Sequence, residues 1–111
     1  MANPTPDIKT DIEQDVKKKP RLDVAEPSMY NVIFINDDVT TMEFVVDSLI
    51  EIFQYDHPRA AEITAVVHEE GSAVVATLPY EIAEQKGVEV TVMARDAGFP
   101  LQIKLEVADE S

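Results

Sequence analysis

The feature that most constrains the fold is a repeated switch between two hydrophobic periodicities after Pro27. Apolar residues alternate with polar ones, or form short β-branched runs, where strands are expected, and they recur every three to four residues where helices are expected. The expected strands are YNVIFI at 30–35, SAVVATL at 72–78 and LQIKLEV at 101–107. The resulting order, β-α-α-β-α-β, predicts an α+β fold in which a three-stranded antiparallel sheet packs against three helices on one face.

Capping residues, proline and glycine predict where the three helices begin and end. Thr40 and Glu43 have the spacing of a capping box, and the apolar face of the first helix follows them. It consists of Phe44, Val45, Leu49, Ile52 and Phe53. A second helix is expected from Asp56, with Pro58 in its first turn, to a stop at Gly71. The third is expected from Pro79 to near Gly98.

Composition divides the chain at about residue 26. Residues 1–26 contain three of the seven prolines, no aromatic residue, and six acidic against five basic side chains. Such a segment buries too little apolar surface to offset its ordering entropy, so it is expected to be a flexible N-terminal extension. Ile8, Ile12 and Val16 have helical spacing and leave open a helix formed on a partner. Residues 27–111 form the expected folded domain.

Charge and residue usage exclude several classes of function. The formal net charge is -13, which disfavours nucleic acids and anionic membranes as partners. Cysteine is absent, so disulfides and thiolate chemistry are excluded, and cytoplasmic localisation is expected. No stretch resembles a secretory signal or approaches the roughly 20 apolar residues of a transmembrane helix. The protein is expected to be soluble and monomeric, with no cofactor.

An acidic turn directly follows the first strand. Asn36, Asp37 and Asp38 stand together in a chain that has no lysine or arginine from 22 to 58. Their oxygen atoms suit a cationic ligand, but Asn and Asp at a strand end before a helix are also common turn and cap residues. Neither His57 nor His68 has the spacing of a metal-binding motif with an acidic residue, so no metal site is expected.

Longer motifs resemble a known family. The segments PSMYNVIFINDDVTTMEFVVDSLIEIF, AAEITAVVHEEGSAVVA and EIAEQKGVEVTVMARDAGFPLQIKLE resemble the bacterial ClpS adaptor over residues 27–106. This resemblance implies a non-enzymatic N-end rule adaptor. Such an adaptor binds substrates that begin with Phe, Tyr, Trp or Leu and delivers them to ClpA, the AAA+ unfoldase of the ClpAP protease.

The resemblance also implies a substrate site. Asn36, Asp37 and His68 would clamp the α-amino group, with Asp38 contributing charge and turn structure. An N-terminal ammonium has three donors and no acceptor, so these oxygen and nitrogen acceptors suit it. The implied hydrophobic pocket is formed by Phe34, Thr40, Met42, Val45, Thr64, Val67 and Leu101. For Val45 and Val67, core packing explains the residue about as well.

Two pocket positions depart from the family pattern. Thr64 stands where the family usually has Met at the pocket entrance, and Phe34 stands where a smaller aliphatic is common. A reshaped pocket with an altered preference among Phe, Tyr, Trp and Leu is therefore expected. The direction of the change stays open, because losing a Met opens space whereas Phe34 fills it.

A second surface is implied at the start of the third helix. Glu81 and Lys86 match the ClpA-docking region. Lys86 is expected to be exposed, where it could form a specific ion pair, although most surface lysines have no such role and the pair would contribute little affinity. In the family the N-terminal extension is engaged by the unfoldase during delivery.

Two other classes of function fit the residues less well. A hydrolase built on Asp37, Asp38, His68 and Ser72 lacks an oxyanion turn, and an acidic ribosomal-stalk-like module explains the charge but not the Asn-Asp-Asp turn.

Overall fold

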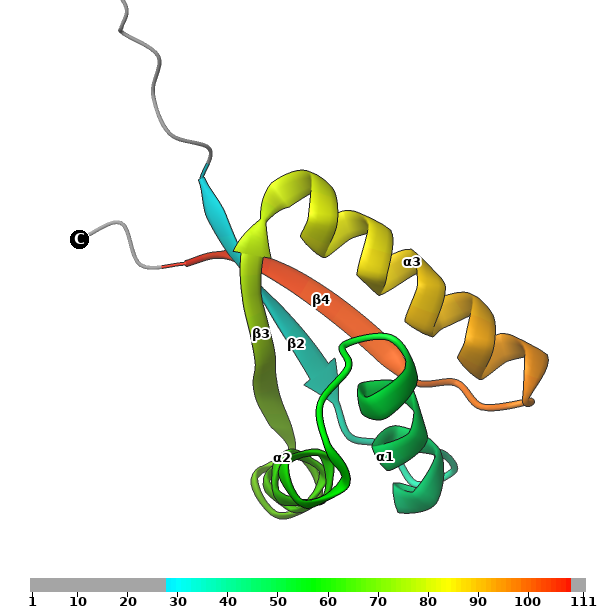
Figure 1. Cartoon of the computed structure of the whole chain (residues 1–111). Helices are drawn as coiled ribbons and strands as arrows, with labels where there is room; N and C mark the ends of the chain where they lie inside the picture. Colours follow the sequence, from blue (N-terminus) through cyan, green and yellow to red (C-terminus); the bar gives the residue numbers. More distant parts are fainter. Residues whose placement is uncertain (1–27, 109–111) are drawn as a thin grey trace, which may run out of the picture.

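The computed structural model describes residues 28–108 and has the predicted order of elements (Figure 1). The elements are β2 (Met29–Ile35), α1 (Met42–Glu51), α2 (His57–Glu70), β3 (Ser72–Pro79), α3 (Tyr80–Asp96) and β4 (Gln102–Val107). The predicted N-terminal extension, residues 1–26, lies outside the described residues. Within the described part, no helix is long and apolar enough to cross a membrane.

The sheet has the strand order β3-β2-β4, with both neighbours antiparallel to the central strand. Along β2, Val32 and Phe34 are fully buried, while Ile33 between them pairs with Val74, which is 51% exposed. One face of the sheet is therefore the core face and the other meets solvent, as the alternating sequence predicts. This confirms the three-stranded antiparallel sheet packed against helices.

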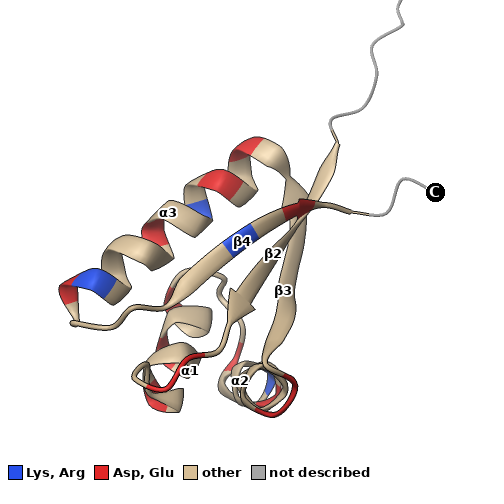
Figure 2. Cartoon of the chain, turned by 180° about the vertical axis from the view of Figure 1, so that it is seen from behind, with Lys and Arg blue, Asp and Glu red and all other residues tan. Residues whose placement is uncertain are grey.

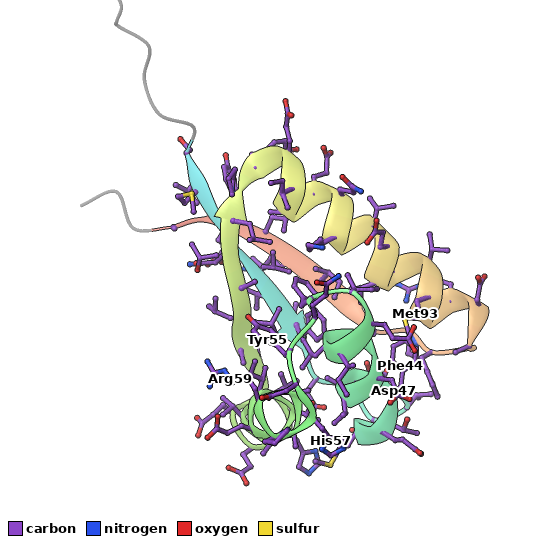
Figure 3. All side chains as sticks on the ribbon, in the orientation of Figure 1. Phe44, Asp47, Tyr55, His57, Arg59 and Met93 are labelled. Atoms are coloured by element: carbon purple, nitrogen blue, oxygen red, sulfur yellow. The ribbon has the colours of Figure 1, made fainter. Side chains whose placement is uncertain are left out.

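An irregularity in β3 anchors the segment between α1 and α2. Val32 pairs with Ala76 and Ile33 pairs with Val74, which leaves Val75 as the extra residue of a bulge. The Val75 side chain is buried, and its carbonyl accepts a hydrogen bond from the Tyr55 hydroxyl. Figure 3 shows Tyr55 beside β3. This contact holds the α1–α2 connection against the sheet.

The helices cover the core in two groups. Helices α1 and α2 pack against each other at the end of the sheet toward which β2 points, and α3 runs along β4 (Figure 1). The buried stripe of α3 is made of small side chains, namely Ala83, Gly87, Val90 and Ala94. A Cβ placed on Gly87 would lie 3.6 Å from Ile103 Cγ2, so α3 lies directly on β4 at this point.

The start and end of α1 correct two predictions. The N-cap is Thr41, whose hydroxyl oxygen accepts from the Phe44 amide at 3.1 Å, and not Thr40. Thr40 is held by Asp37 instead, which moves the helix start by one residue and removes the predicted capping box. The helix ends at Glu51, so Ile52 is its C-cap and Phe53 lies in the following turn.

The other helix ends agree with the sequence signals. Asp56 caps α2 by accepting from the Arg59 amide at 3.0 Å, and Gly71 ends it with φ 91°. Only glycine adopts this left-handed conformation readily, which is why the helix stops there. His57 is the first residue of α2, as its position beside Pro58 suggested (Figure 3). Helix α3 follows Pro79 directly and ends just before Gly98.

Candidate functional site

The Asn-Asp-Asp turn, residues 36–38, is attached to the C-terminal end of α2. The Asn36 backbone N–H donates to the Gly71 carbonyl at 2.9 Å, directly after β2 ends. His68 lies in the last turn of α2, three residues before Gly71. The fold therefore brings the turn and His68 to the same end of α2, although 32 residues separate Asn36 from His68.

Asp37 builds the turn. Its Oδ1 accepts from the Val39 amide at 2.8 Å and the Thr40 amide at 2.7 Å, and its Oδ2 accepts from the Thr40 hydroxyl at 2.8 Å. Each carboxylate oxygen has two acceptor directions, so Oδ2 keeps capacity for a ligand donor. The turn structure was predicted to come from Asp38, but Asp37 makes these hydrogen bonds and Asp38 is exposed.

These contacts also set the charge state of Asp37. Desolvation raises its pKa, but the hydrogen bonds from Thr40 and Val39 and the positive charge of Arg95 outweigh this. The net effect holds the pKa of Asp37 below its usual value, so the carboxylate is ionised throughout the neutral range. A fixed negative charge therefore lies at the turn.

Replacing Asp37 by Asn is expected to lower the free energy of unfolding by roughly 1 kcal/mol at pH 7, a modest amount because solvent screens this partly exposed group. A depressed folded-state pKa stabilises the protein above the unfolded-state pKa, about 3.9 for Asp. That stabilisation disappears as the pH falls through the lower folded-state value. Urea unfolding of both proteins at pH 7 and pH 2.5 measures it, and an equal difference at both pH values would contradict the prediction.

Three other side chains at this end of α2 are available to a ligand. Within residues 28–108, the side chains of Asn36, Asp38 and His68 make no hydrogen bond. Asn36 is half-buried, and Asp38 and His68 are exposed. An amide oxygen, a carboxylate and an imidazole nitrogen are thus free to accept hydrogen bonds from a cationic group.

The residues of the predicted hydrophobic pocket fall into two groups. Five of them are at most 5% exposed, namely Phe34, Val45, Thr64, Val67 and Leu101. All of these except Thr64 belong to the main apolar core cluster. Thr40 is half-buried and Met42, the first residue of α1, is 46% exposed. The five buried residues are therefore part of the folded core, and Thr40 and Met42 are the members of the predicted set that reach solvent.

Thr64 and Phe34, the two predicted pocket residues that depart from the family pattern, both interact with neighbouring residues. The Thr64 hydroxyl donates to the Ala60 carbonyl at 2.8 Å, one turn earlier in α2, so its hydrogen-bonding capacity is directed to its own helix. The Phe34 ring packs edge-to-face on Phe53, with ring centroids 6.0 Å apart. Phe53 in turn stacks on Tyr55. Phe34 is thus one end of an aromatic cluster under the α1–α2 connection.

Lys86 differs from its prediction. Its side chain is half-buried, its Nζ donates to the Ile52 carbonyl at 2.9 Å, and it lies 5.9 Å from the centre of the Phe53 ring. Carbonyls at a helix C-terminus lack partners within the helix and attract cations. Lys86 therefore ties α3 to the end of α1 and is not a freely exposed lysine. Glu81, in the first turn of α3, is exposed.

Arg95 is a residue that the sequence analysis missed. Its Nη1 donates to the carbonyls of Phe99 and Leu101, at 3.0 and 2.9 Å, and so holds the loop that leads to Leu101, a residue of the predicted pocket. Its positive charge also lowers the pKa of Asp37. A single arginine near the end of a helix has no sequence pattern, so only the three-dimensional structure connects it to the turn. Within residues 28–108, no group of His, Asp or Glu side chains is arranged to hold a metal ion.

Comparison with known proteins identifies the family. Residues 25–104 match the family described as ATP-dependent Clp protease adaptor protein ClpS. The chain is 43% identical to the ClpS adapter of Escherichia coli O127:H6 over 98 residues, covering 88% of this chain and 92% of that protein. It is 39% identical to the ClpS adapter of Clostridium acetobutylicum over 98 residues, covering 88% and 95% of the two chains.

A solved structure shares the fold. The structure of Agrobacterium tumefaciens ClpS2 bound to L-phenylalaninamide superimposes with a TM-score of 0.72 at 36% sequence identity, covering 74% of this chain and 99% of that one. The family match, residues 25–104, contains the turn, α2 and the loop before β4. This chain therefore belongs to the ClpS family of ATP-dependent Clp protease adaptor proteins.

Proposed function

We propose that this protein binds the first residue of substrate proteins through its free α-amino group and bulky hydrophobic side chain, and delivers those proteins to the ClpA unfoldase. The observation that carries the proposal is the ligand of the related ClpS2, L-phenylalaninamide. This molecule has a free amine and a benzyl side chain, and its amide stands in for the first peptide bond. It is the smallest mimic of an N-terminal phenylalanine.

The amine would bind where the turn meets α2. Asn36 Oδ1, an Asp37 oxygen and an unprotonated nitrogen of His68 are three acceptors on segments that the Asn36–Gly71 hydrogen bond holds together. An α-amine titrates near pH 8 and carboxylates near pH 4, both approximately, so the partners carry opposite charges at neutral pH. The domain's 16 acidic against four basic residues also attract a cationic terminus at longer range (Figure 2).

The side chain of the first residue would enter between α1, α2 and the loop that carries Leu101. Burying a large apolar side chain contributes roughly 1.5–3 kcal/mol, whereas a small or polar one contributes far less. Met42 at the rim is half exposed, and its unbranched thioether adapts to rings of different shape. On this proposal the protein accepts Phe, Tyr, Trp and Leu and rejects small first residues.

Docking to the unfoldase is proposed at the start of α3, with Glu81 and Lys86 as contacts. Glu81 presents a free carboxylate on the surface. Lys86 would have to leave the Ile52 carbonyl to form an intermolecular ion pair, so its net contribution to affinity is small. The close packing of the pocket wall favours one alternative, a ClpA modulator that does not bind N-terminal residues.

Fluorescence anisotropy of labelled peptides tests the proposal. Peptides that begin with Phe, Tyr, Trp or Leu are expected to bind. A peptide that begins with Ala is expected to bind at least about tenfold more weakly, because its small side chain forfeits more than about 1.4 kcal/mol of apolar burial. The affinities of the four binders are expected to differ from one another because Thr64 and Phe34 reshape the pocket. Absence of binding by all peptides would leave the modulator as the function.

The Thr64→Met variant tests the reshaped pocket separately. Its longer side chain replaces one whose hydroxyl bonds only to its own helix, so the order of affinities among Phe, Tyr, Trp and Leu is expected to change. Val66→Met is a matched control, because Val66 is on the same helix but 43% exposed. An unchanged order in Thr64→Met, or equal affinities for all four residues in the natural protein, would show that Thr64 does not set the preference.

A further inference from the structure

An apolar groove lies between α3 and β4, an edge strand of the sheet. It has a volume of about 290 Å³, and its lining includes Val88, Thr91 and Val92 of α3 and Ile103 and Leu105 of β4. Val88 and Val92 are 56% and 54% exposed, and they lie one helical turn apart on the same side of α3. Within residues 28–108, two adjoining aliphatic side chains of the groove therefore remain largely uncovered.

The size and charge of the groove suit an amphipathic helix. Pockets that enclose a small molecule usually have about 300–1,000 Å³, so this groove is at the lower limit and suits a few side chains. Helical residues at i and i+4 form a ridge that packs against the surface of another helix. Acidic residues recur along α3 (Figure 2), and Glu84 lines the groove itself. A helix with an aliphatic face and basic residues would complement these features.

One segment of the chain, outside the described residues, has this composition. Ile8, Ile12 and Val16 recur every four residues, and the lysines at 17–19 follow them directly. Pro20 disfavours continuation of a helix, and lysines in a last helical turn are favoured by the partial negative charge there. A helix of about 12 residues is marginal in water by itself. The pattern therefore predicts a helix that forms on an apolar surface.

The position of β2 brings this segment within reach of the groove. Met29 pairs with Pro79, which directly precedes α3, and Tyr30 pairs with Val107 at the end of β4. The chain therefore enters the domain at the end of the sheet where α3 begins. Residues 17–28 span up to roughly 40 Å when extended, whereas α3 with its 17 residues is about 26 Å long. The aliphatic segment can therefore reach any part of the groove.

We propose that residues 8–19 bind in this groove of their own chain, as a helix that packs its aliphatic face on α3 and β4. The C-terminal end of the segment is tethered to Met29, so it lies nearest the start of α3 and the helix runs antiparallel to α3. Its lysines then lie near Glu81 and Glu84, in the first two turns of α3. On the proposed function, docking of the unfoldase at Glu81 would release the segment. The inference itself does not depend on binding of N-terminal residues.

Dimensions and connectivity favour this occupant. Eight residues separate Ile8 from Val16, as they separate Glu84 from Val92 on α3, which is about 12 Å in each helix. A second copy of the chain is the competing occupant. Copies with a net charge of -13 repel each other, whereas a tether of about a dozen residues holds the segment at an effective concentration in the millimolar range. Charge and connectivity therefore both favour the segment of the same chain.

Cysteine cross-linking of the full-length protein tests the inference, because the chain contains no cysteine of its own. The groove pair is Ile12→Cys with Val88→Cys, and the control pair is Ile12→Cys with Val74→Cys. Val74 is 51% exposed and lies on the solvent face of the sheet. It lies five residues before Pro79, and Val88 lies eight residues after Tyr80, so both are roughly 12–16 Å from the end where the chain enters. With oxidised glutathione, the groove pair is expected to form its intramolecular disulfide at least about tenfold faster than the control pair.

Two further variants of the groove pair test the aliphatic face of the segment. Adding Ile8→Asp and Val16→Asp is expected to slow the disulfide to the rate of the control pair, because burying a carboxylate in an apolar groove is unfavourable. Adding Thr10→Asp and Gln14→Asp is the matched control. It introduces the same charge on the opposite side of the expected helix, and it is expected to keep at least about half of the rate.

Each outcome supports or overturns the inference. Equal rates for the groove pair and the control pair would overturn it, as would a groove pair that Ile8→Asp and Val16→Asp leave unchanged. Equal slowing by the two double Asp changes would show that charge, and not the aliphatic face, holds the segment, and would overturn it as well. Disulfide-linked dimers that form equally fast in a mixture of the Ile12→Cys and Val88→Cys proteins would assign the groove to a second copy. None of these results bears on peptide binding, so the inference and the proposed function fail separately.

Discussion

Acetylating the amine of a phenylalanine-initiated peptide is expected to weaken its binding to this protein by at least about a hundredfold. Acetylation removes the positive charge and two of the three N–H donors. Each lost charge-assisted hydrogen bond costs about 1.5–3 kcal/mol, so two of them give about two orders of magnitude or more. The acceptors at the end of α2 would lose their cationic partner and face a bulky amide instead.

Substitutions of Asn36 and His68 test which residues bind the free amine. Asn36→Ala and His68→Ala are each expected to weaken binding of the free-amine peptide about tenfold or more and to leave the residual binding of the acetylated peptide unchanged. Asp37 is less suitable for this test because its replacement also loosens the turn through Val39 and Thr40. Asp47→Asn is the matched control, an exposed carboxylate of α1 outside the turn (Figure 3).

Anisotropy titrations of the free-amine and acetylated peptides with each variant measure how strongly the effect of each substitution depends on the free amine. A clamp variant that weakens the free and acetylated peptides by the same factor would show that its residue does not contact the amine. Equal binding of free and acetylated peptides to the natural protein would remove the amine from the recognition mechanism entirely.

Deleting residues 1–26 is expected to abolish delivery of substrates to ClpA while leaving peptide affinity within about twofold, which is below 0.5 kcal/mol. The proposed peptide site is built from residues 34–101, and the first strand begins at Met29. The deletion therefore leaves every residue of the proposed site in place. The expected loss of delivery rests on the proposal that the unfoldase engages residues 1–26.

Two measurements on the same truncated protein distinguish peptide binding from delivery to the unfoldase. Anisotropy gives the peptide affinity, and degradation of a fluorescent substrate that begins with Phe, by purified ClpA and its peptidase, gives delivery. Replacing residues 1–26 by a Gly/Ser segment of equal length tests whether length alone suffices. Normal degradation with the truncated protein would exclude a role for the extension in delivery.

Strand and helix order was predictable from residues 29–107 because local signals agree with one another. Alternation in 30–35 predicts the central strand, and Asp56, Pro58 and Gly71 delimit α2 as they do in the structure. The start of α1 was wrong by one residue because two adjacent threonines both fit a cap. Asp37 decides between them by taking Thr40 into the turn, a choice that helix-cap spacing does not reveal.

The candidate site was predictable only through the resemblance to ClpS, since Asn-Asp-Asp after a strand equally fits an ordinary turn. The expected exposure of Lys86 was wrong, because a lysine on an amphipathic helix usually faces solvent. Here the unpaired carbonyl at the end of α1 lies within its reach. Such a partner comes from a segment 34 residues away and has no signature near Lys86 itself.

The sequence by itself determined the order of strands and helices, the acidic character of the domain and the family, because periodicity, caps and motifs are properties of neighbouring residues. Only the tertiary structure decided what each site residue touches. The Asn36 amide donates to the Gly71 carbonyl, and the Thr64 hydroxyl donates to the Ala60 carbonyl. The positive charge of Arg95 lowers the pKa of Asp37. These contacts depend on how the helices pack on the sheet, and packing joins residues that no local pattern relates.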